Sequence, residues 1–388
     1  MSTAPAGSAG TGILGRAKGS PIAYAVLALV ALLIGNLLVT PSFLSVRLQD
    51  GHLYGSLVDI VRNGAPVMIV GLGMTLVIAT RGIDLSVGAL AAIAGSVACV
   101  SIAGASDPTS AGAAVVAMFT ALAVCVVLGL WNGFLVSVLG IQPIIATLVL
   151  MTAGRGIAQL ITGGNITTVR NAAFRQLGAG YLLVPIAVIV VAAAITLVAL
   201  LTRRTALGTF IESVGINPEA SRLAGVRSRT IVFTVYVFSA FCAALAGLMI
   251  ASNVSSADAN SIGLYIEMDA ILAAVIGGTS LAGGRYSLPG TVVGALLIQT
   301  LTTTVYTAGI PTQVTLVFKA VVVIAVCLLQ SPQARGLLRR RRTSAQPAVP
   351  GPRSSAQTPA PSVALPDVLG PSSTPSGPSS STPKVAQP

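Results

Sequence analysis

The chain alternates long apolar runs with short polar or charged segments, and this pattern predicts membrane-spanning helices. Most of the apolar runs are about 20 residues long, the length that an α-helix needs to cross a bilayer. The candidate spans cover residues 21–39, 60–80, 84–105, 111–138, 142–162, 181–202, 230–252, 267–283, 288–308 and 312–331. The predicted fold class is an all-α polytopic membrane protein with about ten transmembrane helices.

Two apolar regions, one in each half of the chain, are interrupted by glycine and polar residues. GMTLVIATRGIDLSVG at 73–88 predicts a helix break near 81–86, and AVIGGTSLAGGRYSLPG at 274–290 predicts another near 277–287. Broken helices in transporters often border the solute path. Two interpretations of the first break are open. Asp84 caps the following helix, alone or paired with Arg81, or it lines a solute path with Ser86, Asn132 and Gln142.

One charged stretch, Arg203 to Arg229, carries five arginines and two glutamates between apolar runs. Its second half predicts a short capped helix, with Asn217 as N-cap, Pro218 in the first turn, Glu219 at the positive end of the helix dipole and Gly225 at the left-handed end. About two helical turns are too few to be stable alone. The helix is therefore expected either to dock on a soluble partner or to lie on lipid headgroups.

Basic residues lie unevenly around the candidate spans. If the chain starts in the cytoplasm, Arg81, residues 203–229, Arg285 and residues 335–342 fall inside. The basic residues clearly outside are Arg47, Arg170 and Arg175. This agrees with the excess of Lys and Arg on cytoplasmic loops, so both termini are predicted to be cytoplasmic.

The composition supports a membrane protein, because 54% of the 388 residues are hydrophobic and only 8% are charged. Soluble domains carry about 25% charged residues. The net charge of +12 is explained by topology rather than by nucleic-acid binding, since most of the excess sits beside apolar spans or in the tail. Residues 1–20 are predicted to form a cytoplasmic tail, and residues 332–388, basic and then rich in Pro, Ser and Thr, a disordered cytoplasmic tail.

Signatures of enzymes and metal sites are missing from the sequence. It contains no GxxxxGK[ST], GxSxG or HExxH motif, and its four cysteines all lie in apolar runs. The single histidine, His52, is expected to be solvated in a polar loop. Neither catalytic residues nor a metal site is predicted. A transporter or a structural membrane scaffold remains, and the scarcity of intramembrane carboxylates counts against ion coupling.

A few other polar or small residues within the apolar runs have predicted positions. Arg155 and Lys319 are expected to face protein or a water-filled cavity, or to reach an interface, rather than to contact lipid. The GxxxG spacings at Gly129–Gly133 and Gly290–Gly294 predict close helix packing.

Several motifs in the same order resemble the permeases of ribose-type sugar ABC importers. They are residues 73–88, GTFIESVGINPEASRLAGV at 208–226 and residues 274–299, and the resemblance runs from about residue 20 to 331. Within that family, residues 48–60, 131–164 and 255–278 are most similar to galactofuranose permeases. Two departures are Arg81, where the family usually has glycine, and the long C-terminal tail. We interpret Arg81 as a residue of the cytoplasmic edge.

The resemblance implies a permease domain over residues 21–331 that carries a monosaccharide, galactofuranose or a similar sugar, across the bacterial inner membrane. The implied partners are a separate ATPase subunit that binds ATP and Mg, a periplasmic or lipid-anchored sugar-binding protein, and a second permease subunit of the same or another sequence. No cofactor is expected on this chain. The alternative is a secondary transporter or facilitator of a small polar solute.

The resemblance also implies that residues 208–226, within the cytoplasmic loop 203–229, couple the permease to the ATPase. The candidate coupling residues are Gly208, Glu212, Gly215, Asn217, Pro218, Glu219 and Gly225.

Overall fold

The computed structural model describes residues 21–49, 51–309, 311 and 314–330. The chain divides into two units, Met1–Arg339 and Arg340–Pro388, and the described residues all belong to the first. The predicted tails, residues 1–20 and 332–388, lie outside the described residues.

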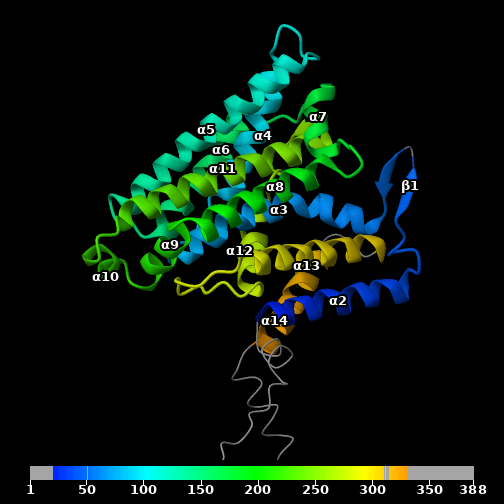
Figure 1. Cartoon of the computed structure of the whole chain (residues 1–388). Helices are drawn as coiled ribbons and strands as arrows, with labels where there is room; N and C mark the ends of the chain where they lie inside the picture. The colour runs from blue at the N-terminus through cyan, green and yellow to red at the C-terminus, as the bar shows by residue number, and fades with distance from the viewer. Residues whose placement is uncertain (1–20, 50, 310, 312–313, 331–388) are drawn as a thin grey trace, which may run out of the picture. The chain divides into compact units, whose positions relative to one another are not determined.

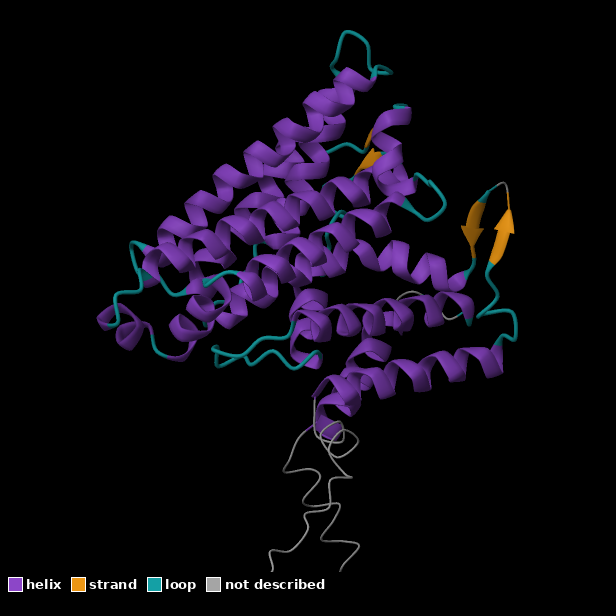
Figure 2. Cartoon of the chain, viewed as in Figure 1, coloured by secondary structure: helices purple, strands orange, loops and turns teal. Residues whose placement is uncertain are grey.

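The described chain is built almost entirely of helices (Figures 1 and 2), which confirms the predicted fold class. The helices are α2 (Pro21–Val39), α3 (Ser56–Ala79), α4 (Val87–Ala103), α5 (Ala111–Ser137), α6 (Pro143–Thr162), α7 (Ala172–Ala179), α8 (Ile186–Arg204), α9 (Leu207–Ile216), α10 (Pro218–Leu223), α11 (Ser228–Val254), α12 (Ile266–Ile276), α13 (Leu288–Thr307) and α14 (Thr315–Gln330). Two short antiparallel strand pairs join β1 (Arg47–Gln49) to β2 (His52–Tyr54) and β3 (Thr167–Thr168) to β4 (Ser256–Ala257).

Seven of the described helices are long and apolar enough to cross a membrane, namely α2, α3, α5, α6, α8, α11 and α13. Each matches a predicted span with small differences at its ends. The largest is in α8, which begins at Ile186 rather than at the predicted residue 181. Residues 181–185 instead form a turn in which Tyr181 pairs with Pro185 in an isolated bridge. Proline has no N–H to donate, so it suits the position just before a helix.

The three remaining predicted spans correspond to shorter helices, with 17 residues in α4, 11 in α12 and 16 in α14. The prediction of one span over 267–283 is wrong in its second part, because α12 ends at Ile276. Gly278, Gly283 and Gly284 then adopt positive φ, which a continuing helix does not allow. At about 1.5 Å per residue, α12 covers roughly half of a hydrocarbon core. The number of about ten spans and the cytoplasmic location of both ends stay predictions.

The core forms where small residues let helices approach closely. Helix α11 packs against α3, α4 and α5. A Cβ added at Gly247 of α11 would lie 2.1 Å from the Ala91 carbonyl oxygen of α4, so the two backbones touch. The GxxxG glycines also serve packing: a Cβ at Gly129 would lie 2.5 Å from the Cβ of Ala240, and one at Gly294 would lie 2.2 Å from the Ala273 carbonyl oxygen. The predicted close packing is confirmed.

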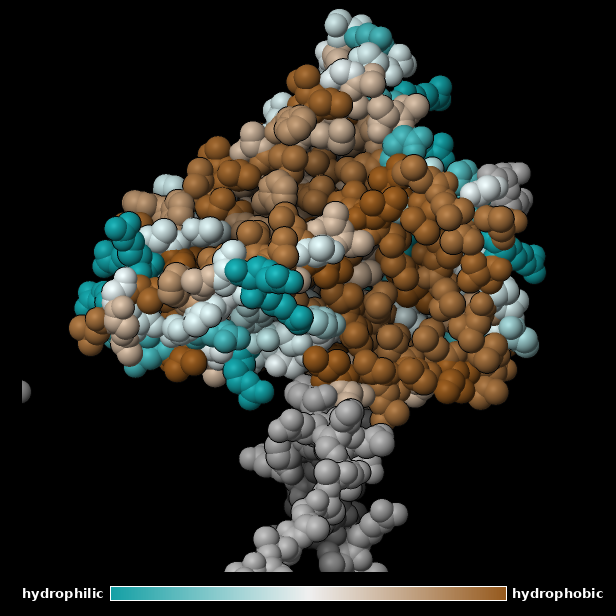
Figure 3. All heavy atoms as spheres, in the orientation of Figure 1, coloured by the Kyte–Doolittle hydropathy of each residue, from teal (hydrophilic) through white to brown (hydrophobic). Residues whose placement is uncertain are grey.

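The outer surface separates apolar from polar side chains along the helices. Figure 3 shows hydrophobic residues over much of the visible face and hydrophilic residues gathered around α9 and α10. Exposed large apolar side chains occur on α2, α5, α6 and α8, for example Leu38, Phe119, Leu160 and Leu197. Exposed apolar flanks with polar ends are what a bilayer environment requires.

The β1–β2 hairpin precedes α3 and docks on the turn before α8. The Leu53 N–H donates to the Leu183 carbonyl at 3.3 Å, and His52 Nδ1 lies 2.8 Å from the Leu182 carbonyl oxygen. His52 also packs against Tyr181, with 5.5 Å between ring centroids. His52 is partly exposed, as expected for a polar loop, while one side of its ring lies against the neighbouring turn.

Candidate coupling site and solute path

The charged loop between α8 and α11 folds into two short helices, α9 and α10. Helix α10 has the predicted caps: Asn217 Oδ1 accepts from the N–H groups of Glu219 and Ala220, each at 3.1 Å, and Pro218 is the first helical residue. Gly225 adopts φ of +86° just after the helix. The predicted short helix is confirmed, and each cap acts through the chemistry that predicted it.

Helix α9 was not predicted from the sequence. Its N-cap position is Ala206, which has no capping side chain, although Thr205 Oγ1 accepts from the Leu207 N–H at 3.2 Å, and the residues of Leu207–Ile216 are mostly apolar. Gly208, Ile211, Val214 and Gly215 are its buried residues, and they share one face because they recur every three or four positions. This face joins α9 to the rest of the protein.

The two glycines of α9 allow contacts that no side chain would permit. A Cβ at Gly208 would lie 2.2 Å from the Thr202 carbonyl oxygen and 2.9 Å from the Tyr286 hydroxyl. A Cβ at Gly215 would lie 1.9 Å from the Ala79 carbonyl oxygen and 2.5 Å from the Gly284 nitrogen. Helix α9 therefore rests directly on the end of α3 and on the loop 277–287.

The same junction is closed by hydrogen bonds from both helix breaks. The Gly284 N–H donates to the Ala79 carbonyl at 2.9 Å, which ties the second break to the first. Arg81 Nε donates to the Gly215 carbonyl at 2.6 Å, and a second guanidinium nitrogen of Arg81 donates to the Ile216 carbonyl. These carbonyls end α9, where a cation is favoured by the unpaired C=O groups and the helix dipole.

Arg81 holds an unusual backbone conformation at this junction. Its φ of +65° is a left-handed value that glycine adopts without cost, whereas another residue loses about 1 kcal/mol. The side chain is exposed and points to α9 rather than to Asp84. The possible Arg81–Asp84 pair is therefore wrong, because Arg81 instead binds the last carbonyls of α9.

The opposite side of α9 and α10 faces outward. Ile216 is 63% exposed and Leu223 is 86% exposed, and the candidate coupling residues Glu212 and Glu219 are exposed too. Glu219 pairs with Arg222 at 2.9 Å, but both side chains are more than two-thirds exposed. Such a pair contributes less than about 1 kcal/mol. Apolar and charged groups on this side are thus free to meet another molecule.

A cavity of about 330 Å³ lies beside α9, between Thr202, Glu212, Tyr286 and the start of α13. Burial raises the pKa of Tyr286, and the nearby Glu212 carboxylate acts in the same direction. The phenol therefore stays protonated at neutral pH and can serve as a hydrogen-bond donor.

At the first helix break, the structure brings together three of the four candidate path residues. Asp84 Oδ1 accepts from the Ser86 N–H at 3.0 Å and from the Ser86 hydroxyl at 2.6 Å. Asn132 Nδ2 donates to the Ser86 hydroxyl at 2.9 Å. Gln142 lies apart: it is exposed at the start of α6, and no hydrogen bond between the described residues joins it to the cluster. We call Asp84, Ser86, Asn132 and the Ser239 described next the Asp84 cluster.

Helix α11 completes the Asp84 cluster with residues that the sequence analysis missed. The Ser239 hydroxyl donates to Asp84 Oδ2 at 2.8 Å. The Tyr236 hydroxyl lies next to the break, since a Cβ at Gly82 would be 2.4 Å from it. Within the described chain, this hydroxyl and Asn132 Oδ1 are buried without a hydrogen-bond partner. A serine or tyrosine in an apolar helix carries no distinguishing signal, so the sequence predicted the helix α11 but not its part in the Asp84 cluster.

The interpretation of Asp84 as the cap of α4 is wrong, because Ser86 holds the N-cap position without a side-chain cap, and the Asp84 carboxylate instead binds Ser86 in the turn before the helix. Its burial, with 1% of the side chain exposed, also makes it an ionisable group inside the protein that is held by hydroxyl donors. An ionisable side chain within the membrane-spanning part of a protein costs free energy, so such residues usually have a role in folding or transport. The solute-path role of the cluster stays a prediction.

The second break is also built on glycines and a cap. A Cβ at Gly277 would lie 2.2 Å from the carbonyl carbon of Gly290, so the loop returns close to its own starting point. The Ser287 hydroxyl caps α13 by accepting from the Gly290 N–H at 3.1 Å. Both predicted breaks, near 81–86 and 277–287, are confirmed as irregular segments between helices.

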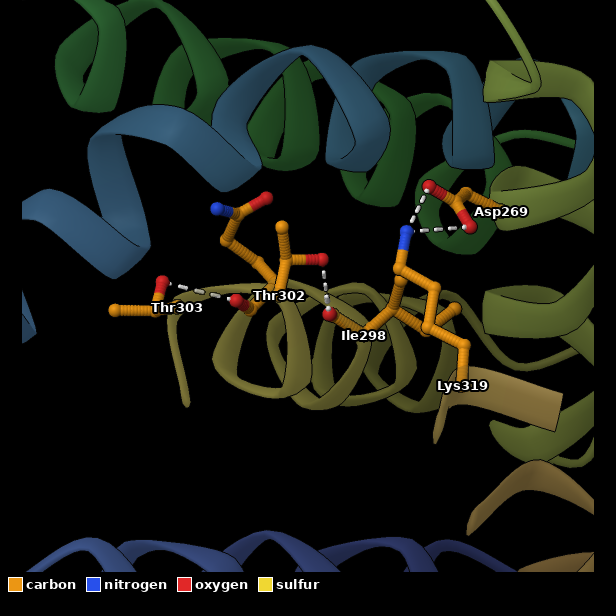
Figure 4. A network of polar contacts seen from close by, with 6 residues as sticks. Asp269, Ile298, Thr302, Thr303 and Lys319 are labelled. Atoms are coloured by element: carbon orange, nitrogen blue, oxygen red, sulfur yellow. Dashed lines mark hydrogen bonds and ion pairs between the residues drawn. The ribbon is translucent and has the colours of Figure 1, made fainter. Parts of the chain in front are cut away.

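The two predicted intramembrane cations face protein. Lys319 of α14 binds both carboxylate oxygens of Asp269 of α12, at 2.8 and 3.1 Å (Figure 4). Arg155 donates from one guanidinium nitrogen to the carbonyls of Ala259 at 3.0 Å and Ile262 at 2.6 Å. Both cations therefore have hydrogen-bond or ion-pair partners within the chain, which is expected because exposing a charged side chain to lipid costs free energy.

Comparison with known proteins gives a family for this architecture. The family model described as "Branched-chain amino acid transport system / permease component" matches residues 56–327. The galactofuranose transporter permease of Escherichia coli strain K12 is 49% identical over 320 residues, covering 82% of this chain and 92% of that protein. The fructose import permease of Bifidobacterium longum is 39% identical over 333 residues, covering 83% and 92%. The ribose import permease of Escherichia coli strain K12 is 35% identical over 300 residues, covering 76% and 91%. No solved structure matches the chain.

Proposed function

The chain belongs to the family of ABC-importer permease components, and from that premise we propose that it carries a monosaccharide through the bacterial inner membrane, powered by a separate ATPase. It is a multi-pass membrane protein and a transport subunit. The relatives named for galactofuranose, fructose and ribose support a sugar, and the 49% identity to the galactofuranose permease favours galactofuranose or a similar sugar.

The observation that carries the proposal is the α9–α10 element. One face of α9 rests on the end of α3 and on the loop 277–287, while the side carrying Ile216 and Leu223 is exposed. A six-residue helix is too short to be stable by itself, and its leucine, Leu223, is 86% exposed. Both features are expected of a surface that another protein covers. We assign the ATPase to this surface, with Leu223 and Val226 as apolar contacts and Glu212 and Glu219 as partners for its basic groups.

The coupling mechanism follows from the contacts of α9. A displacement of α9 by the ATPase presses on the Ala79 carbonyl and on Gly284, because a Cβ at Gly215 would already overlap both. Arg81 transmits the reverse motion, since its hydrogen bonds make the end of α3 follow α9. Both helix breaks therefore move together, and such breaks are where a packed helix bundle can change shape at low cost.

Asp84 and Ser86 of the Asp84 cluster lie within the first break, so the same motion reaches the cluster. We assign Asp84, Ser86 and Asn132 to the solute path in the state where the cluster opens, with Gln142 at its exposed end. Carboxylate, hydroxyl and amide groups exchange hydrogen bonds with sugar hydroxyls readily. In the described structure Asp84, Ser86 and Asn132 hydrogen-bond to one another instead, and Asn132 Oδ1 has no partner among the described residues.

The chain itself performs no covalent chemistry in this proposal, and ATP and Mg bind to the ATPase subunit. The other partners are a periplasmic or lipid-anchored sugar-binding protein, a second permease subunit, identical or different, and the bilayer. Nucleic acid has no role. Both chain termini lie on the cytoplasmic side, where α9 and α10 meet the ATPase.

The testing experiment is purification of the tagged chain in mild detergent from its native host, followed by identification of the proteins that accompany it. A P-loop ATPase in stoichiometric amount is expected. In proteoliposomes, uptake of the sugar should require ATP. Uptake without ATP and without an associated ATPase would instead establish the alternative, a secondary transporter or facilitator.

A paired substitution tests the docking surface itself. Leu223→Asp places a charge where an apolar contact is proposed, so it should weaken ATPase binding about tenfold or more. Leu182→Asp is the matched control, since Leu182 is also exposed, at 65%, but lies near the hairpin. Equal ATPase binding by both variants would remove α10 from the interface.

A further inference from the structure

A second cavity lies at the other end of α3 from the coupling site. It has a volume of about 340 Å³ and lies between the β1–β2 hairpin and α7. The hairpin directly precedes Ser56, where α3 begins, whereas α9 rests on Ala79, where α3 ends. Twenty-four helical residues separate the two sites, a length of about 36 Å. Figure 1 shows the hairpin and α10 at opposite ends of the molecule's helices.

One wall of this cavity is aromatic. His52 and Tyr54 from the hairpin meet Tyr181, with ring centroids 5.5 Å apart for His52–Tyr181 and 5.4 Å apart for Tyr54–Tyr181. Arg62 holds Tyr181 in place through two contacts. Its guanidinium lies 5.6 Å from the ring centroid and donates to the phenol oxygen at 3.1 Å. Tyr54 remains 41% exposed, so an aromatic surface is available to a ligand.

The facing wall is one side of α7. Ala172, Arg175, Gln176 and Ala179 line the cavity, at spacings of three and four residues that place them on one helical face. The alanines leave room, while Arg175 supplies donors and Gln176 supplies both a donor and an acceptor. Among the described residues that line the cavity there is no carboxylate.

An aromatic wall opposite an amide and a guanidinium fits the two faces of a sugar ring. The C–H face of a sugar is apolar and packs on aromatic rings, and its hydroxyls are donors and acceptors for planar polar side chains. The volume is within the range of about 300–1,000 Å³ that small-ligand sites occupy. A free inorganic anion would use Arg175 but leave the aromatic wall without a role.

We propose that this cavity is a monosaccharide-binding site, with Tyr54 as stacking surface and Gln176 and Arg175 as hydrogen-bond partners of the hydroxyls. The choice of a sugar rests on the proposed function, but the site is separate from the Asp84 cluster and the coupling surface. On the proposed topology it opens to the outer side, where it holds sugar released by the binding protein before the path opens.

The test uses the full chain in lipid nanodiscs, without ATPase or binding protein, and ligand-observed NMR. The probes are methyl β-D-galactofuranoside, D-ribose, D-fructose and inorganic phosphate. Saturable binding of at least one sugar is expected, with a dissociation constant on the order of 1 mM. Tyr54→Ala and Gln176→Leu should each weaken it about tenfold. Tyr306→Ala is the control, since Tyr306 is an exposed tyrosine on α13 outside the cavity.

Three results would overturn the proposal. They are no saturable sugar binding by the wild-type chain, binding of phosphate alone, or sugar binding that Tyr54→Ala and Gln176→Leu leave unchanged. If these variants lose affinity for the sugar-binding protein and retain sugar binding, the cavity is a protein-docking surface instead. ATPase co-purification and ATP-dependent uptake are measured separately, so failure of this site leaves the importer assignment standing.

Discussion

At the scale of single residues, the coupling site depends on positions where no side chain, or an unusual one, is required. Gly208 and Gly215 let one face of α9 touch the backbone of neighbouring segments, and Arg81 reaches the end of α9 from a left-handed backbone. These features concern contacts between segments far apart in sequence. A glycine in an apolar run does not reveal by itself which backbone it faces.

Gly215→Ala is expected to lower coupled transport strongly. The added Cβ would lie 1.9 Å from the Ala79 carbonyl oxygen and 2.5 Å from the Gly284 nitrogen, and neither backbone group can yield without moving a helix break. ATP-driven uptake in proteoliposomes should fall about tenfold or more, since overpacking costs about 1–3 kcal/mol. The readout is uptake per ATP hydrolysed.

Gly156→Ala is the matched control for this substitution. Gly156 also lies inside a helix, α6, but an added Cβ there meets nothing within 4 Å. The control should transport normally, since alanine is a better helix former than glycine. Normal coupling in Gly215→Ala as well would show that α9 does not transmit force through this contact.

Arg81→Gly separates stability from coupling. Glycine removes the left-handed strain of about 1 kcal/mol, while loss of the hydrogen bonds to Gly215 and Ile216 costs a similar or larger amount. Thermal stability should therefore stay the same or fall slightly. Uptake per ATP hydrolysed should fall, because the end of α3 no longer follows α9.

Arg81→Lys retains the charge and the backbone strain but replaces a planar fork by a single ammonium group. The uptake per ATP hydrolysed by Arg81→Lys should lie between the values for wild type and for Arg81→Gly. If Arg81→Gly couples ATP hydrolysis to uptake as well as wild type does, Arg81 is merely a basic residue of the membrane edge.

At the scale of helices, sequence reasoning succeeded where signals are local. Asn217, Pro218 and Gly225 define α10 through interactions within a few residues, and glycines with a polar neighbour mark both breaks. Sequence reasoning failed for features that depend on tertiary contacts. The N-cap position of α9 is an alanine, and Ser239 joins the Asp84 cluster from 155 residues away, so neither could be found by reading along the chain.

Asn217→Ala tests the local account of α10. Removing the cap should destabilise this six-residue helix by about 1 kcal/mol, because the N–H groups of Glu219 and Ala220 lose their acceptor. Hydrogen exchange of residues 218–223 should accelerate about fivefold. The measurement is hydrogen–deuterium exchange by mass spectrometry on the purified chain.

Ser110→Ala provides the comparison, since Ser110 also caps a helix by accepting from the Ala113 N–H, at 3.1 Å. That helix, α5, has 27 residues and packs against α4 and α11, so exchange beyond its first turn should not change. Unchanged exchange of α10 in Asn217→Ala would mean that contacts other than the cap hold this helix.

At the scale of the whole described unit, α2 and α14 form a flank with its own apolar cluster. Ala25, Ile276, Leu297, Val323 and Val326 make up this cluster, which is distinct from the main core. Two polar links attach the flank as well. Asn36 Nδ2 donates to the Thr304 hydroxyl at 2.8 Å, and Lys319 pairs with Asp269. The flank is thus joined to the rest of the unit by its own apolar cluster and by polar links, while the breaks and the Asp84 cluster lie in the main body.

The Lys319–Asp269 pair gives the last prediction. Its side chains are 15% and 19% exposed, and the surrounding helices are apolar. Asp269→Leu leaves an unpaired ammonium in these surroundings, which should lower the free energy of unfolding by about 3–5 kcal/mol. The double variant Asp269→Leu/Lys319→Met removes both charges and should regain most of that stability, because a buried pair offers little over apolar packing. Thermal unfolding in one detergent measures both. Equal stability of Asp269→Leu and wild type would show that Lys319 reaches water at the membrane edge, and α14 would then be held by its apolar contacts alone.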